Sequence, residues 1–166
     1  MEELKIAKDR LLNIYGKLVE GKTIHVIPTK NIPQGIAAAL SFNPEEKVSV
    51  NKVNMIHAIE NITAGQITYA VRNTRMDNFT LKKGDIIGLD DKKILAKGNS
   101  IVDCAKKLIS ALKEDYHAVI NLYYGQDVKE EDAVKIQEEI QAEYPDFAVE
   151  LFAGGQAVYY FIVSLE

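Results

Sequence analysis

The stretch AVINLY at residues 118–123 decides the fold, because a strand, a helix and a further strand can be traced outward from it. Its apolar, partly β-branched composition predicts a buried strand. After it, Asp127-x-x-Glu130 resembles a capping box, and Ala133, Ile136 and Ile140 recur at helical spacing until Pro145. Residues 147–152 and 157–165 then predict two strands, which we expect to form a hairpin across Gly154-Gly155.

The segments before residue 118 extend the same pattern. We expect strands at residues 66–71 and 79–81, and a hairpin that joins residues 85–89 to 93–96 around Asp90-Asp91. The capping box Ser100-x-x-Asp103 predicts the start of a helix that ends at Leu112. Residues 64–166 therefore predict an α/β (α+β) fold, a two-layer sandwich of helices on a mixed sheet.

Residues 1–63 have a different organisation, with a single expected strand. The spacing predicts helices over residues 4–18, 33–40 and 50–62, and the run Thr23 to Ile27, closed by Pro28, predicts a buried strand. We expect these residues to form an incomplete helix–strand–helix lobe. A lone strand has two open edges, so a homodimer through this lobe is possible.

Composition excludes several classes of protein. The 166 residues carry a formal charge of −4 at pH 7, which argues against nucleic-acid and anionic-membrane binding. A single cysteine, Cys104, allows no intrachain disulfide. The chain contains no apolar run of the ~20 residues that span a bilayer, so we expect no membrane insertion and a cytoplasmic location.

Catalytic motifs have little support in this sequence. Residues 16–23 satisfy the P-loop pattern G-x-x-x-x-G-K-[ST], but a helix is expected before them and a strand after them, the reverse of a working P-loop. The three histidines, His25, His57 and His117, show no metal-ligand spacing. Cys104 lies on the inner face of its predicted helix, which is typical of a buried structural thiol. We therefore expect no catalytic residue and no metal site.

Two segments are candidates for binding. The loop from Thr29 to Gly35 leaves a predicted strand and enters a helix, and the backbone amides of Gln34 and Gly35 could bind an anion. The pairs Tyr123-Tyr124 and Tyr159-Tyr160 place four of the eight tyrosines on what could be two strands of one sheet. Ordinary turn formation and ordinary sheet packing are the simpler explanations of the two features.

Five ordered motifs resemble a known family: HVIPTKNIPQG at residues 25–35, GQITYAVRNT at 65–74, KGDIIGL at 83–89, YYG at 123–125 and GGQAVYY at 154–160. Together they resemble the C-terminal region of the dihydroxyacetone-kinase-like, ATP-binding component of bacterial fatty acid kinase. The resemblance implies that ATP and magnesium bind a separate N-terminal domain that this chain does not contain. It also implies that the C-terminal region docks a DegV-type protein that carries the fatty acid.

We therefore expect a non-catalytic docking domain without a cofactor of its own. The alternatives are a small-molecule or anion sensor that uses residues 29–35, and a self-contained phosphotransferase. The residues expected to contact a partner or ligand lie in three segments of the chain: Thr29, Lys30, Asn31, Pro33, Gln34 and Gly35; Arg72, Asn73 and Thr74; Tyr123 and Tyr124.

Overall fold

The computed structural model describes residues 24–90 and 93–166, and the chain divides into two compact units, Met1–Asn61 and Ile62–Glu166. The helix expected at residues 4–18 and the P-loop match at residues 16–23 lie outside the described residues.

The described part of the first unit is a pair of packed helices, α2 (Ile32–Leu40) and α3 (Val48–Glu60). The Asn31 side chain caps α2 by accepting a hydrogen bond from the backbone N–H of Gln34. Between the helices, the buried Asn51 side chain accepts from the Asn43 N–H and donates to the Asn43 carbonyl, at 2.7 Å each. These contacts fix the turn between the two helices.

The strand expected at Thr23 to Ile27 is wrong for its described residues, 24–27, which are neither helix nor strand. A strand requires hydrogen-bonding neighbours, and the only described bond here is a tight turn in which Thr29 N–H donates to the Ile27 carbonyl. The homodimer expected from open strand edges therefore loses its structural basis.

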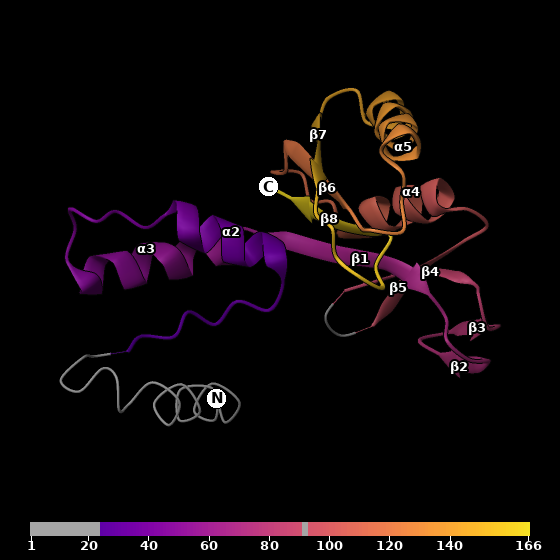
Figure 1. Cartoon of the computed structure of the whole chain (residues 1–166), viewed down its shortest axis with the longest axis horizontal. Coiled ribbons are helices and arrows are strands. Elements are labelled where there is room, and N and C mark those ends of the chain that lie inside the picture. Colours follow the sequence, from indigo (N-terminus) through magenta and orange to yellow (C-terminus); the bar gives the residue numbers. More distant parts are fainter. Residues whose placement is uncertain (1–23, 91–92) are drawn as a thin grey trace. The chain divides into compact units, whose positions relative to one another are not determined.

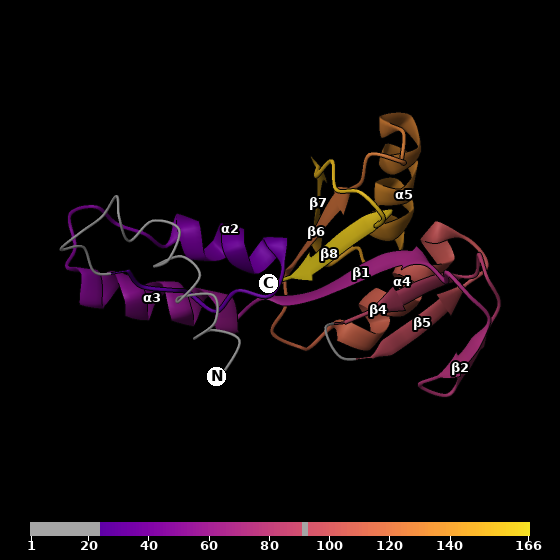
Figure 2. The same ribbon diagram turned by 60° about the horizontal axis from the view of Figure 1, so that its bottom comes forward.

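The second unit contains a mixed six-stranded sheet in the order β5-β4-β1-β8-β6-β7 (Figures 1 and 2). Its strands are β1 (Thr63–Tyr69), β4 (Ile86–Leu89), β5 (Ile94–Gly98), β6 (Val119–Tyr124), β7 (Ala148–Ala153) and β8 (Phe161–Leu165). β6 and β7 are parallel and all other neighbours are antiparallel. The expected α+β fold with helices on a mixed sheet is confirmed.

Helices α4 (Ile101–Leu112) and α5 (Glu130–Glu143) pack on one face of this sheet. The main core lies between them and the strands, and its fully buried members include Leu108, Ile140, Ile67 and Val163. On the opposite face a short hairpin, β2 (Thr74–Met76) and β3 (Phe79–Leu81), covers a smaller cluster around Leu81 and Ile87. The sequence analysis missed β2, a strand of only three residues.

The capping box at Ser100 is confirmed, because the Ser100 hydroxyl accepts from Asp103 N–H and the Asp103 carboxylate accepts from Asn99 N–H. The box expected at Asp127 is wrong. α5 begins after Lys129, whose side chain makes no capping bond.

The hairpin expected between residues 147–152 and 157–165 is also wrong. β8 lies between β1 and β6, whereas β7 pairs in parallel with β6 alone. All five residues of β8 are buried, as a central strand requires, whereas β7 has exposed residues along it. Gly154-Gly155 is therefore part of a crossing loop.

Candidate functional site: the carboxyl edge of the sheet

The ends of β1, β6 and β7 meet at one edge of the sheet, which we call the carboxyl edge. β1 and β6 both run antiparallel to β8, and β7 runs parallel to β6, so all three strands point the same way. The loops that follow them begin at Ala70, Gly125 and Gly154. Ligands and partners of open sheets with parallel strands commonly bind at such an edge.

The crossing loop, residues 154–160, is bound to the end of β6 by backbone hydrogen bonds. Gly154 and Gly155 N–H both donate to the Tyr124 carbonyl, at 3.0 and 3.1 Å, and Gly125 N–H donates to the Tyr160 carbonyl at 2.9 Å. The Gln156 side chain adds a bond from its Nε2 to the Tyr123 carbonyl at 2.8 Å. The loop is thus held against β6 along most of its length.

Gly125 permits this close approach. A Cβ atom there would lie 2.1 Å from the carbonyl oxygen of Tyr159 and 2.7 Å from that of Gln156. Both are backbone atoms that cannot rotate away. Gly125 is therefore required by the packing of the crossing loop.

Val158 is the strained residue of the loop. Its φ is 73°, and the Tyr159 N–H donates across it to the Ala157 carbonyl at 2.9 Å, which forms a γ-turn. A β-branched residue rarely adopts this conformation. The Thr68 hydroxyl donates to the Val158 carbonyl at 2.8 Å and fixes the turn, while the Val158 side chain is 54% exposed. Strain of this kind concentrates at binding sites.

The tyrosine pairs divide between core and surface. Tyr124 and Tyr160 pack against the main core, whereas Tyr123 stacks on the exposed ring of Phe152, with ring centroids 5.2 Å apart. Burial raises the pKa of the Tyr123 hydroxyl. Tyr159 and Tyr160 lie in the crossing loop, so the expectation that both pairs occupy strands is wrong for the second pair.

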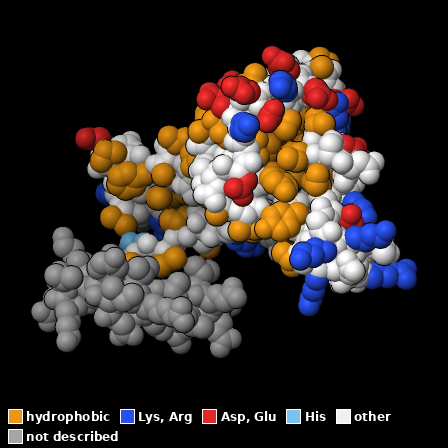
Figure 3. Space-filling model, turned by 45° about the vertical axis from the view of Figure 1, so that its right-hand side comes forward, with side chains coloured by type: hydrophobic (Ala, Val, Ile, Leu, Met, Phe, Trp, Pro, Cys, Tyr) orange, Lys and Arg blue, Asp and Glu red, His pale blue; other side chains and the backbone are white. Residues whose placement is uncertain are grey.

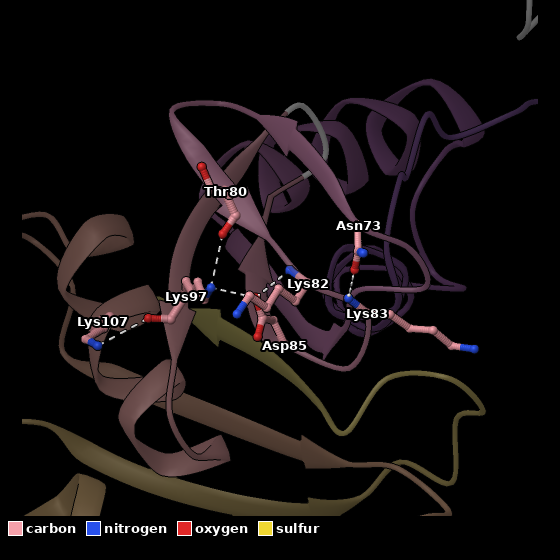
Figure 4. Close-up of polar contacts among 7 residues, drawn as sticks. All are labelled: Asn73, Thr80, Lys82, Lys83, Asp85, Lys97 and Lys107. Carbon is pink, nitrogen blue, oxygen red and sulfur yellow. Dashed lines mark hydrogen bonds and ion pairs between the residues drawn. The ribbon is translucent and has the colours of Figure 1, made fainter.

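The segment Arg72 to Thr74 leaves β1 at the same edge. Arg72 is exposed and makes no hydrogen bond or salt bridge with the described residues. The Asn73 side-chain oxygen accepts from Lys83 N–H at 2.8 Å, so Asn73 shapes the turn (Figure 4). Thr74 begins β2. Of these three residues, Arg72 is the one whose side chain is free for a partner.

The β2–β3 hairpin is fixed beside this segment. Lys97 forms a salt bridge with Asp85, and its Nζ donates to the Thr80 carbonyl at 3.1 Å (Figure 4). The Asp85 carboxylate also accepts from Lys82 N–H at 2.7 Å. The hydrogen bond from Lys82, together with Lys97, lowers the pKa of Asp85.

The loop Thr29 to Gly35 lies in the other unit, and most of its polar groups are already bonded. The amides proposed for an anion are occupied: Gln34 N–H donates to the Asn31 side chain and Gly35 N–H to the Asn31 carbonyl. The Gln34 side chain accepts from Lys30 N–H at 2.9 Å, and Pro33 is buried. The anion site is therefore not supported. The exposed side chains of the loop are Thr29, Lys30 and Ile32.

The structure thus brings two of the three expected segments, Arg72 to Thr74 and Tyr123-Tyr124, to one edge. Four of the five sequence motifs also reach this edge, because residues 65–74, 83–89, 123–125 and 154–160 each begin or end there. A family model for the C-terminal domain of FakA-like fatty acid kinase proteins matches residues 10–166. The chain belongs to this family.

This FakA-like chain has longer relatives. Protein YloV of Bacillus subtilis (strain 168) is 34% identical over 148 residues, which are 89% of this chain and 27% of YloV. Protein SERP0792 of Staphylococcus epidermidis is 36% identical over 149 residues, 90% of this chain and 27% of its own. The chain therefore spans about a quarter of the length of these relatives.

Cys104 and His117 of this family member have structural roles. Cys104 is fully buried, and burial raises the pKa of its thiol to about 12, which keeps it protonated and unreactive. His117 is buried, and its Nδ1 accepts from Glu114 N–H at 2.9 Å. Within residues 24–90 and 93–166, no three His, Cys, Asp or Glu residues form a possible metal site. In the same residues, no helix has both the length and the apolar character needed to cross a membrane.

Sequence reasoning missed the crossing loop and the turn at residues 82–85 as parts of the site. The motif GGQAVYY is the sequence signal for the loop, but its paired glycines are equally typical of a hairpin turn. Nothing in the sequence shows that Val158 adopts a positive φ.

Proposed function

We propose that this chain is the docking domain of a fatty acid kinase, and that its partner is a DegV-type protein loaded with fatty acid. The carboxyl edge is the docking surface, and the chain supplies neither nucleotide nor metal to the phosphoryl transfer. Membership of the FakA-like C-terminal domain family of fatty acid kinase supports this assignment.

One observation carries the proposal: an exposed arginine and the strained crossing loop occupy the same edge of a rigid sheet. Arginine is enriched at the energetically important positions of protein interfaces. The hydrogen bonds from residues 125, 154 and 155 hold the edge in one conformation, so little conformational entropy is lost when a partner binds. Val71, the chain neighbour of Arg72, and Val158 of the crossing loop are both more than half exposed and provide apolar area at the edge.

Titration calorimetry with a purified, fatty-acid-loaded DegV-type protein tests this function. We expect saturable binding by the wild-type chain, and a Kd raised at least tenfold by Arg72→Ala, about 1.4 kcal/mol, with the melting temperature unchanged. Lys135→Ala is the matched control, since Lys135 lies on α5 and its ion pair with Asp132 is exposed.

Tyr124 needs a milder change, because its ring packs against the core. Tyr124→Phe keeps that packing and removes the hydroxyl alone.

Absence of binding by the wild-type chain would contradict the proposed function. Equal binding by wild type and Arg72→Ala would contradict the assignment of the site.

A further inference from the structure

Charge is distributed unevenly over the second unit, although the whole chain is acidic. Figure 3 shows blue Lys and Arg side chains gathered at one end of this unit, and red Asp and Glu side chains with some blue ones among them at the other. The basic end includes Arg72, Arg75, Lys82 and Lys83, which lie on the β2–β3 hairpin and the turns on either side of it. We call these four residues the basic hairpin.

The positive charge of the basic hairpin is not neutralised by the described residues. All four side chains are exposed, and none forms a salt bridge within residues 24–90 and 93–166. The two carboxylates nearby have other partners. Asp85 pairs with Lys97, and the Asp77 carboxylate accepts from Ile94 N–H at 2.9 Å.

The basic hairpin is also rigid. Its two-residue turn has positive φ at Asp77 and Asn78, 50° and 67°, the geometry of a type I′ turn. Asp77 ties the tip to β5, and Asn73 ties the base to Lys83. Four cations are thus displayed on a fixed frame, which favours recognition of a surface of defined shape.

A lipid surface fits this hairpin poorly. Segments that insert into membranes expose large apolar side chains between basic ones. Here Leu81 is buried, Phe79 packs inward, and the tip is the polar pair Asp77-Asn78. Met76, at 51% exposure, is the only large apolar side chain of the two strands, β2 and β3, that is mostly exposed. These features favour a folded protein as the partner.

We propose that the basic hairpin binds an acidic surface of the protein carrier and thereby accelerates its association with this chain. This inference rests on the proposed function, because Arg72 belongs both to the basic hairpin and to the carboxyl edge. Complementary charges increase mainly the association rate, and salt screens the effect. The cations of the hairpin would then act mainly on the association rate, and the apolar contacts of the edge mainly on the dissociation rate.

Stopped-flow association with the fatty-acid-loaded DegV-type protein, at low and at high salt, separates the two contributions. For the double variant Arg75→Glu/Lys83→Glu we expect an association rate at least tenfold lower at low salt, and close to the wild-type rate at high salt. Lys135→Glu, which reverses a charge on α5, leaves the rate within about twofold of wild type. If the double variant is unstable, Arg75→Gln is the milder change to use, and we expect it to lower the association rate by a smaller factor.

Other outcomes would overturn the inference. If wild type and the double variant associate at equal rates without salt dependence, the inference is wrong, although docking itself remains. The inference is also wrong if the wild-type chain binds anionic vesicles, the double variant does not, and both associate with the carrier at the same rate. Salt-sensitive self-association of the chain, lost in the double variant, would assign the hairpin to the acidic α5 of a second copy. No binding of the carrier at any salt would contradict both the inference and the proposed function.

Discussion

At the scale of single residues, Gly125 makes the carboxyl edge possible. Its missing side chain lets the crossing loop lie directly on the end of β6, where Gly125 N–H donates to the Tyr160 carbonyl. The edge therefore depends on a residue whose role is to leave room for the crossing loop.

Gly125→Ala is expected to destabilise the chain by about 2 to 4 kcal/mol, since the new Cβ would overlap two backbone carbonyls. Urea unfolding followed by circular dichroism measures this change. Gly35→Ala is the control, for which we expect the free energy of unfolding to change in the opposite direction. Gly35 lies inside α2 and a Cβ there meets nothing within 4 Å, so helix propensity predicts a gain of about 0.5 to 1 kcal/mol. A neutral Gly125→Ala would mean that the crossing loop does not lie on β6.

Cys104 gives the chain a predictable response to alkali. Its thiol has a pKa of about 12 in the folded state because of burial, against an ordinary value of 9.0. The unfolded thiol ionises first, so the contribution of the neutral, buried thiol is complete below pH 9 and is lost as pH rises towards 12.

We therefore expect the free energy of unfolding to fall above pH 9 more steeply for wild type than for Cys104→Ala. The difference in slope approaches ~1.4 kcal/mol per pH unit. Chemical denaturation at a series of alkaline pH values measures both slopes. Parallel curves would show that the thiol is not protected by burial.

At the scale of elements, the sequence predicts local structure well and strand order poorly. Helices α3, α4 and α5 and the β4–β5 hairpin lie within a few residues of their predicted positions, because spacing and capping residues are local signals. The order of β7 and β8 depends on which strand is buried on both faces. The nearly continuous apolar run FIVSL indicates that β8 is that strand, but the preceding Gly154-Gly155 favours a hairpin between β7 and β8.

The two helices on the sheet differ at their N-termini in a testable way. Ser100 caps α4 through its hydroxyl, whereas Lys129 precedes α5 with extended backbone and no capping bond. Ser100→Ala should destabilise the second unit by about 1 kcal/mol, and Lys129→Ser should stabilise it by a similar amount. Thermal unfolding of both variants checks the pair. If both substitutions raised, or both lowered, the melting temperature, this account of the caps would be contradicted.

At the scale of the whole molecule, the candidate site is assembled from segments that are far apart in sequence. Arg72 and Tyr124 could be identified singly from motifs, but their arrangement at one edge follows from the position of β8 between β1 and β6. The net charge likewise does not predict the basic surface of the second unit. The chain carries −4, yet the structure gathers four exposed cations on one hairpin and places the acidic first turn of α5 elsewhere on the sheet.

The most direct test of docking at the carboxyl edge is hydrogen exchange of this chain, alone and with the fatty-acid-loaded DegV-type protein. The backbone amides of residues 70–73, 82–85 and 154–160 should gain protection on binding. The opposite edge, around residues 113–117, and the outer turns of α5 should be unchanged. Protection confined to those latter segments, or no protection anywhere in the presence of saturating carrier, would contradict the account.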